Sequence, residues 1–417
     1  MTAAVRAPLM SLDDALQALL ACVRPLSLHE TVATFDADGR VLAQDVVSDL
    51  QVPAFDNSSM DGYAVRSADV PVAGVVLTVT QRIAAGHQGV PLGAGQAARI
   101  FTGAPIPPGA DAVVMQEQVA AVSASTPDQV RFSGPVQSGQ WVRRRGEDVR
   151  SGDIVLKRGC SLGPAELGLV ASLGLAHLQV MARPRVALFS TGDELVMPGE
   201  VTPAELPPGA IYNSNRFFLR AMLQRLGCEV TDLGIVPDKR DATIAALRDA
   251  AQHHDLILTS GGVSVGEEDH IKPAVESLGE LNLWQLAIKP GKPFAYGKVN
   301  RDGDACHFMG LPGNPVSSFV TFLLLVRPFV LALQGVTKTE ITRTDMTAHF
   351  DWPRADKRRE FLRVKRNAQG GLDLFPNQSS GVLTSAVWGD GVVDNPAGQT
   401  ISKGDTVRFI SFAEWLA

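Results

Sequence analysis

DLILTSGGVSVGEEDH, the stretch from Asp255 to His270, decides the fold class of this chain. It opens with a predicted strand in which apolar and polar residues do not alternate, and such a strand is typical of a parallel sheet covered on both faces. Gly261 and Gly262 follow, and glycines let successive backbone N–H groups face an anion. Three carboxylates, Glu267 to Asp269, come soon afterwards. Clustered carboxylates beside an anion repel it unless a cation joins them, so the stretch predicts a metal together with a phosphate.

The segments on both sides of this stretch are predicted strands and helices in turn. RVALFST (185–191) and CEVTDLGIV (228–236) predict strands, and NSNRFFLRAMLQRLG (213–227) and DATIAALRDAAQ (241–252) predict helices. Together they predict a doubly wound, three-layer α/β domain over 183–335. Sites in such sheets lie at the carboxyl ends of the strands. We therefore expect the loops that carry Asp193-Glu194, Asp238 and Glu267–Asp269 to converge on one edge.

The remainder of the chain predicts β-rich and helical parts. Short strands divided by Pro/Gly turns predict a β-rich domain over 52–149. It is inserted into a small helical/linker domain made of 8–51 with 150–182, where Ser11 and Asp14 resemble a capping box. The alternating EFLRVKR and GDTVRFISF predict a C-terminal β domain over 336–417, which we expect to be barrel-like. The predicted fold class is multidomain α/β plus β.

Composition and charge exclude several functions. The chain has 417 residues, and its net charge of −6 gives no global reason to bind nucleic acid or an anionic membrane. The four cysteines have no paired spacing, which favours reduced thiols and a cytoplasmic location. The apolar stretch SFVTFLLLVRPFVLALQG (318–335) is interrupted by Arg327-Pro328, so we expect a core helix there and no membrane span.

Positive charge lies near the predicted edge of the sheet. IKPGKPFAYG carries Lys289 and Lys292 on either side of a Pro-Gly turn, whose prolines restrict the backbone. In LPGNPVSS, Asn314 is the expected N-cap and Pro315 the first residue of a helix, whose N-terminus favours an anion. The sequence thus predicts a site with phosphate on donors, a metal on carboxylates and room for a further anion.

Eight motifs, taken in order, make the hypothesis specific. They are DNSSMDGYAV, RIFTGAPIPPGADAVV, RRRGED, FSTGDEL, GAIYNSN, SGGVSVGEED, KPGKPFAYG and GLPGNPVSS. In this order they closely resemble the molybdopterin molybdotransferase family, also called the MoeA or gephyrin E-domain family. The resemblance covers nearly the whole chain, and it implies that the α/β domain is of the molybdopterin-binding type.

The resemblance implies an enzyme that inserts molybdate into adenylylated molybdopterin and releases AMP. Mg²⁺ is the implied cofactor and molybdate a substrate. Catalytic positions carried over from the family are Asp61, Asp148, Glu194, Asp238 and Asp269. Glu194 and Asp269 would also hold the metal. Substrate-binding positions carried over are Thr102, Gly261, Gly262, Ser264, Lys289, Lys292, Pro312, Asn314, Pro315, Arg363 and Ser380.

The family is also one of elongated homodimers whose cleft takes residues from both chains. Implied partners are therefore a second copy, other molybdenum-cofactor proteins and apo-molybdoenzymes. One departure is Gln285, where some relatives carry a basic residue. Two alternatives stay open: an ATP-dependent molybdopterin adenylyltransferase, which shares the α/β domain, and a gephyrin-like scaffold that binds receptor peptides.

Overall fold

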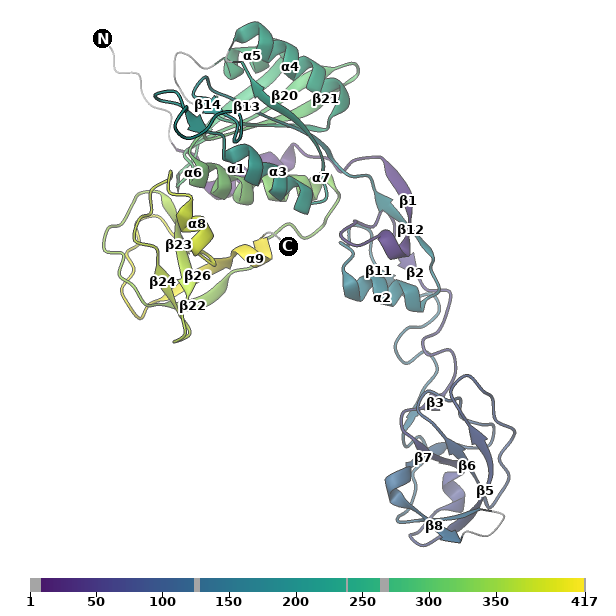
Figure 1. Cartoon of the computed structure of the whole chain (residues 1–417). Helices are drawn as coiled ribbons and strands as arrows, with labels where there is room; N and C mark the ends of the chain where they lie inside the picture. The colour runs from purple at the N-terminus through teal and green to yellow at the C-terminus, as the bar shows by residue number, and fades with distance from the viewer. Residues whose placement is uncertain (1–8, 124–127, 238, 263–269, 416–417) are drawn as a thin grey trace.

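The computed structural model describes residues 9–123, 128–237, 239–262 and 270–415. It is an elongated molecule in which the α/β domain and the C-terminal β domain lie together, while the β-rich domain lies at the far end of the linker domain (Figure 1). This arrangement confirms the predicted multidomain α/β plus β class.

A six-stranded sheet forms the centre of the α/β domain, in the order β16-β13-β17-β21-β20-β18. Its parallel strands are β13 (Arg185–Thr191), β16 (Glu229–Val236), β17 (Leu256–Ser260) and β21 (Asp304–Leu311). The antiparallel strand β20 (Pro293–Arg301) separates β21 from β18 (Gly279–Gln285). Every residue of β17 is buried, which is why its sequence does not alternate.

Helices cover both faces of this sheet (Figure 1). One face carries α4 (Arg240–His253) and α5 (Ile271–Leu278), and the other carries α1 (Leu12–Ala21), α3 (Asn215–Arg225), α6 (Pro315–Thr321) and α7 (Arg327–Leu333). Alternate residues of β17 enter two separate hydrophobic cores, with Leu258 in one and Ile257 in the other. The predicted three-layer arrangement is confirmed.

Helix α1 begins as the sequence predicts but packs elsewhere. Ser11 is its N-cap, and the Ser11 hydroxyl accepts a hydrogen bond from the Asp14 N–H at 3.1 Å. The buried side chains of α1 join the core that lies under α3 and α7. The helix therefore belongs to the packing of the α/β domain, although the predicted linker domain included it.

The apolar stretch after Pro315 is a buried helix. α6, the π-helical segment η4 (Phe322–Val326) and α7 run without interruption from Pro315 to Leu333. In the described part of the chain this is the one helix long and apolar enough to cross a membrane, and 78% of its most apolar window is buried inside the protein. Such burial agrees with the core helix predicted there.

The linker domain is built from two segments far apart in the sequence. β1 (His29–Ala33) pairs with β12 (His177–Met181), and β2 (Val46–Val47) pairs with β11 (Ile154–Leu156). α2 (Pro164–Ser172) packs against the 3₁₀ turn η1 (Thr34–Asp36). A small core that includes Leu42, Leu162 and Val180 joins these elements.

The β-rich domain contains a six-stranded sheet in the order β7-β4-β6-β5-β9-β8. Its strands are β4 (Gly62–Val65), β5 (Val76–Ile83), β6 (Gln96–Ile100), β7 (Ala112–Met115), β8 (Val119–Ser123) and β9 (Gln129–Phe132). Two short strands, β3 (Asn57–Ser58) and β10 (Val142–Arg143), pair at its base. Val52 and Val149, where the chain enters and leaves the domain, form an antiparallel bridge.

Five strands close into a barrel in the C-terminal domain, as predicted. They are β23 (Arg359–Arg366), β24 (Gly371–Leu374), β22 (Thr344–Ala348), β26 (Thr406–Ser411) and β25 (Gly391–Asn395), and β25 pairs again with β23. The short helices α8 (Thr384–Trp388) and α9 (Phe412–Trp415) flank them. Asp394 is buried and forms ion pairs with Arg359 at 2.6 Å and Arg343 at 2.9 Å.

The barrel also takes a strand from the α/β domain. β19 (Ile288–Lys289) runs parallel to β23, with Lys289 opposite Glu360. The backbone around Lys289 is therefore shared between the two domains. This pairing fixes where the barrel stands relative to the edge of the α/β sheet.

Candidate active site

A cleft of about 1080 Å³ opens between the carboxyl edge of the α/β sheet and the barrel. The sheet side contributes the ends of β13, β17 and β21 together with segments 211–215 and 289–293, and the barrel side contributes Arg358 and segment 378–381. Predicted site residues in its wall are Glu194, Gly261, Gly262, Lys289, Lys292, Pro312, Asn314, Pro315 and Ser380. Loops from two domains thus meet where fold logic places a ligand.

The turn after β17 requires its glycines. Gly261 has φ +91° and Gly262 φ +69°, the left-handed region that side chains disfavour. A Cβ on Gly262 would lie 2.4 Å from Ile271 Cδ1, and one on Gly261 would lie 3.0 Å from the Thr191 carbonyl oxygen. The backbone of this turn therefore passes close to the end of β13.

Two asparagines that were not predicted as site residues, Asn213 and Asn215, lie in the wall of the cleft. Asn215 Nδ2 donates to Ser260 Oγ and to the Gly313 carbonyl oxygen, both at 2.7 Å, which ties the end of β17 to the turn before α6. Asn213 is 2% exposed and lines the cleft, and its Nδ2 makes no hydrogen bond with any residue that the structure describes. Both lie in the quoted motif GAIYNSN, so the signal was present, but the side-chain roles depend on the fold.

The two lysines of the Pro-Gly turn are in different electrostatic environments. Lys289 Nζ lies 3.0 Å from Glu360 Oε1 and 3.4 Å from Asp356 Oδ2, so two carboxylates offset its charge. Lys292 is exposed, lines the same cleft and forms no ion pair with any described residue. Lys292 is therefore the lysine of this turn whose charge is available to an anion.

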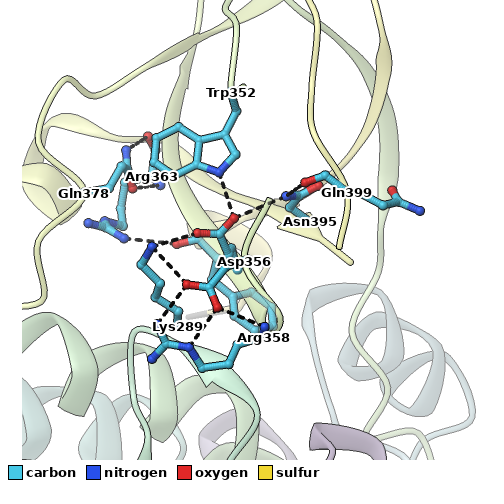
Figure 2. Close-up of polar contacts among 10 residues, drawn as sticks. Lys289, Trp352, Asp356, Arg358, Arg363, Gln378, Asn395 and Gln399 are labelled. Carbon is cyan, nitrogen blue, oxygen red and sulfur yellow. Dashed lines mark hydrogen bonds and ion pairs between the residues drawn. The ribbon is translucent and has the colours of Figure 1, made fainter. Parts of the chain in front are cut away.

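The barrel side of the cleft adds an arginine that the sequence analysis missed. Arg358 donates from Nε and Nη2 to the two oxygens of Asp356, at 3.0 and 2.9 Å (Figure 2). Hydrogen bonds from Arg358 lower the pKa of Asp356 below its ordinary 3.8, and the same pair raises the pKa of Arg358. Both groups are charged at neutral pH. RADKRRE resembles a solvated charge run, and the β19–β23 pairing helps bring it to the cleft.

Arg363 and Ser380 share one local structure but only Ser380 reaches the cleft wall. The Arg363 guanidinium is buried and donates to the carbonyl oxygens of Phe361 and Ser379 and to Ser385 Oγ, at 3.1, 3.3 and 3.1 Å. Burial lowers the pKa of Arg363 to about 10. Arg363 thus supports the 378–381 segment from behind, whereas the Ser380 carbonyl oxygen accepts from the Val316 N–H at 2.9 Å.

Glu194 is the predicted metal ligand that the structure describes. It lines the cleft after β13, and its carboxylate folds over Gly192, where a Cβ would lie 2.5 Å from Glu194 Oε2. The other predicted acidic positions, Asp238 and Asp269, and the predicted phosphate contact Ser264 lie outside the described residues. Within the described ranges, no group of three or more His, Cys, Asp or Glu side chains could hold a metal ion.

Asp61, Thr102 and Asp148 do not lie in the wall of this cleft. The Thr102 N–H and hydroxyl both donate to Asp61 Oδ1 at 2.8 Å, and these bonds lower the pKa of Asp61. The Asp148 N–H donates to the Val52 carbonyl oxygen at 3.0 Å, at the base of the β-rich domain. The structure brings Asp61 and Thr102 together in the β-rich domain, which lies at the far end of the linker domain from the α/β domain (Figure 1).

Gln285 does not line the cleft as the structure describes it. This is the position where the sequence departs from the family pattern. It ends β18, and its carbonyl oxygen accepts from the Met10 N–H at 2.8 Å. In this chain it therefore holds the segment before α1 against the edge of the sheet.

Known protein families and relatives match this chain over most of its length. Family models match at 10–174 (MoeA N-terminal region, domain I and II), 187–332 (probable molybdopterin binding domain) and 345–412 (MoeA C-terminal region, domain IV). A molybdopterin molybdenumtransferase of Haemophilus influenzae is 44% identical over 78% of each chain. One of Synechococcus elongatus is 35% identical over 95% of this chain and 98% of its own.

A solved structure of a MoeA protein has a similar fold. The crystal structure of a molybdopterin biosynthesis MoeA protein from Pyrococcus horikoshii OT3 matches with a TM-score of 0.83 at 27% identity, covering 97% of this chain and 100% of that one. The similarity thus extends over all four parts of the molecule, in sequence and in structure. The chain belongs to the MoeA family, which its eight motifs resemble.

Proposed function

We propose that the cleft inserts molybdate into adenylylated molybdopterin and releases AMP. The observation that carries this proposal is the meeting, in one cleft, of the Gly261-Gly262 turn, the carboxylate of Glu194 and Lys292, which forms no ion pair with the described residues. Relatives that are 44% and 35% identical over most of the chain bear the name molybdopterin molybdenumtransferase. Fold and relatives therefore support the same activity.

The reaction makes two demands on the residues of the cleft. The two dithiolene thiols displace an oxygen from molybdate, which leaves as water with the thiol protons, and a water molecule hydrolyses the phosphoanhydride that joins AMP to the pterin phosphate. Backbone N–H groups and cations stabilise the charge that collects on phosphate oxygens. The glycine turn faces this charge from the α/β sheet, while Lys292 offers an ammonium to the molybdate dianion.

A magnesium ion fits the donors present. Mg²⁺ is usually bound through one or two carboxylates, with substrate phosphates and water completing its coordination. Glu194 supplies such a carboxylate in the cleft wall, and we propose Asp269 as a second ligand. When bound, the ion would polarise the phosphoryl oxygens of the substrate. A single carboxylate in the described wall is compatible with this role because the substrate brings most of the remaining ligands.

The working enzyme is, in this proposal, a cytoplasmic homodimer with composite sites. Asp61 and Thr102 form an exposed, hydrogen-bonded pair on a domain that lies at the far end of the linker domain, and neither residue lines the cleft of its own chain. A second copy would bring the pair to the cleft. Mixing Asp61→Ala chains with Glu194→Ala chains should then restore part of the activity, since one of the two sites in each heterodimer is intact. A mixture as inactive as its components would contradict the composite site.

The test of the function uses purified protein, adenylylated molybdopterin and molybdate. We expect AMP release that depends on molybdate, together with molybdenum bound to the pterin product. Consumption of ATP with molybdopterin alone would instead indicate the adenylyltransferase alternative. Glu194→Gln should reduce AMP release and shift its Mg²⁺ dependence to higher concentrations, because one metal ligand is weakened.

A further inference from the structure

Two cations from different domains meet at one carboxylate on the edge of the cleft. Lys289 comes from β19 of the α/β domain, and Arg358 comes from the segment that leads into β23 of the barrel. Asp356 lies between them, 3.4 Å from Lys289 Nζ and 2.9 Å from Arg358 Nη2 (Figure 2). Lys289 and Arg358 both line the cleft, whereas Asp356 is not in its described wall.

The two carboxylates that contact Lys289 differ in how firmly they are held. Glu360 is 1% exposed, lies on β23 and accepts a hydrogen bond from Trp352 Nε1 at 2.7 Å. Asp356 lies in an irregular segment between β22 and β23, and its side chain is 20% exposed. Lys289 therefore keeps its Glu360 partner if the Asp356 side chain turns away.

We propose that Lys289 and Arg358 form an oxyanion subsite of the cleft, which the carboxylate of Asp356 fills in this structure and a tetrahedral oxyanion of the substrate replaces. This inference rests on the proposed function, since both substrates there carry such an anion. The planar edge of a guanidinium that binds a carboxylate with two hydrogen bonds binds a phosphate-like oxyanion in the same way. The ligand is either free molybdate or the phosphate of the pterin nucleotide.

The proposal fixes the sign of two mutational effects. Arg358→Gln removes a charge-assisted contact and should weaken oxyanion binding roughly tenfold to a hundredfold. Asp356→Asn removes a competing negative charge from the same position and should tighten binding, by about tenfold. If Asp356 only oriented the two cations, its loss would weaken binding instead. The opposite signs separate exchange from orientation.

Isothermal titration calorimetry on the full-length protein measures both effects. Molybdate alone and AMP alone serve as probes, AMP because it carries a phosphate monoester. The matched control is Lys357→Gln, which removes one positive charge from an exposed neighbour that is not in the cleft wall. If Arg358→Gln does not fold, Arg358→Lys keeps the charge but loses the planar edge, and a weaker effect in the same direction is expected.

Each result decides the inference. Weaker molybdate binding in Arg358→Gln but not in Lys357→Gln supports the subsite with molybdate as its ligand, and weaker AMP binding supports it with the nucleotide phosphate. Unchanged binding of both probes overturns the subsite and leaves the proposed function standing. Unchanged or weaker binding in Asp356→Asn overturns the exchange. Failure of the wild-type protein to bind either probe overturns the proposed function as well.

Discussion

Replacing Glu360 with glutamine tests how firmly the barrel holds the edge of the cleft. The Glu360 carboxylate accepts from Lys289 Nζ at 3.0 Å, from Trp352 Nε1 at 2.7 Å and from Asn395 Nδ2 at 3.5 Å. All three partners are donors, so a carboxylate with two acceptor oxygens suits the position. A glutamine amide has one oxygen, and its NH₂ must face at least one of these donors.

The geometry sets the size of the effect. Losing a hydrogen bond to a charged group costs about 1.5–3 kcal/mol, and a buried donor left without a partner adds to that cost. Two features reduce it: the Lys289 side chain is 39% exposed, and Asp356 remains 3.4 Å from its ammonium. We therefore expect Glu360→Gln to lower the local stability of the barrel by about 2 kcal/mol.

Hydrogen exchange followed by mass spectrometry is the suitable assay, because a protein of several domains does not unfold in one transition. Amides of β23 and β19 that exchange through opening of the barrel should exchange roughly 30-fold faster in Glu360→Gln. Amides of β5 and β6 in the remote β-rich domain should not change. Glu340→Gln, which removes the same charge from an exposed side chain, is the matched control and should stay near wild type. Wild-type protection of β23 in Glu360→Gln would refute the reasoning.

Three other predictions follow from the site and the barrel. Lys292→Gln should raise the molybdate concentration needed for half-maximal AMP release about tenfold or more, with little change for the pterin substrate; an unchanged molybdate dependence would place the anion elsewhere. Gly262→Ala should lower the rate of AMP release, because its Cβ would displace the side chains of Ile271 and Thr191, whereas Gly303→Ala, at φ +77° in open space, should lose only about 1 kcal/mol of stability and remain active. Burial alone would raise the pKa of Asp394, but hydrogen bonds from its two arginine partners lower it below 3.8. Its contribution to barrel stability is therefore complete above about pH 4 and lost as the pH falls through the lowered pKa, and acid titration of Asp394→Asn should lack that step.

The sequence predicts those parts of the fold that depend on local pattern. The unalternated strand at Leu256 is buried on both faces as expected, and Ser11 caps α1 as expected. Hydrophobic periodicity, however, shows that one face of a helix is buried without showing against what. That is why the sequence alone assigned α1 to the linker domain, while the structure packs it under α7.

In the candidate site, too, features set by local sequence could be predicted and features set by the packing of domains could not. Glycine turns and lysines at strand ends could be found because the carboxyl edge of a parallel sheet collects them. Arg358 could not be found this way, since its place in the cleft wall depends on the pairing of β19 with β23 across a domain boundary. Arg363 lies in a recognisable motif, yet its guanidinium faces carbonyl oxygens in the barrel, an orientation that no spacing in the sequence reports.

The bridge between Val52 and Val149 has a consequence for how the molecule is divided. The Val52 N–H donates to the Val149 carbonyl oxygen at 2.8 Å, and the Val149 N–H donates back to Val52 at 3.1 Å. The two segments that connect the β-rich domain to the linker domain thus lie side by side. They are spaced like the two strands of a hairpin, and the whole β-rich domain stands in the place of its turn. Domain insertions are tolerated at sites of this kind because their ends already lie together. A two-residue turn in place of 53–148 would close the hairpin, leaving a shortened chain that keeps the cleft between the α/β sheet and the barrel but lacks Asp61 and Thr102.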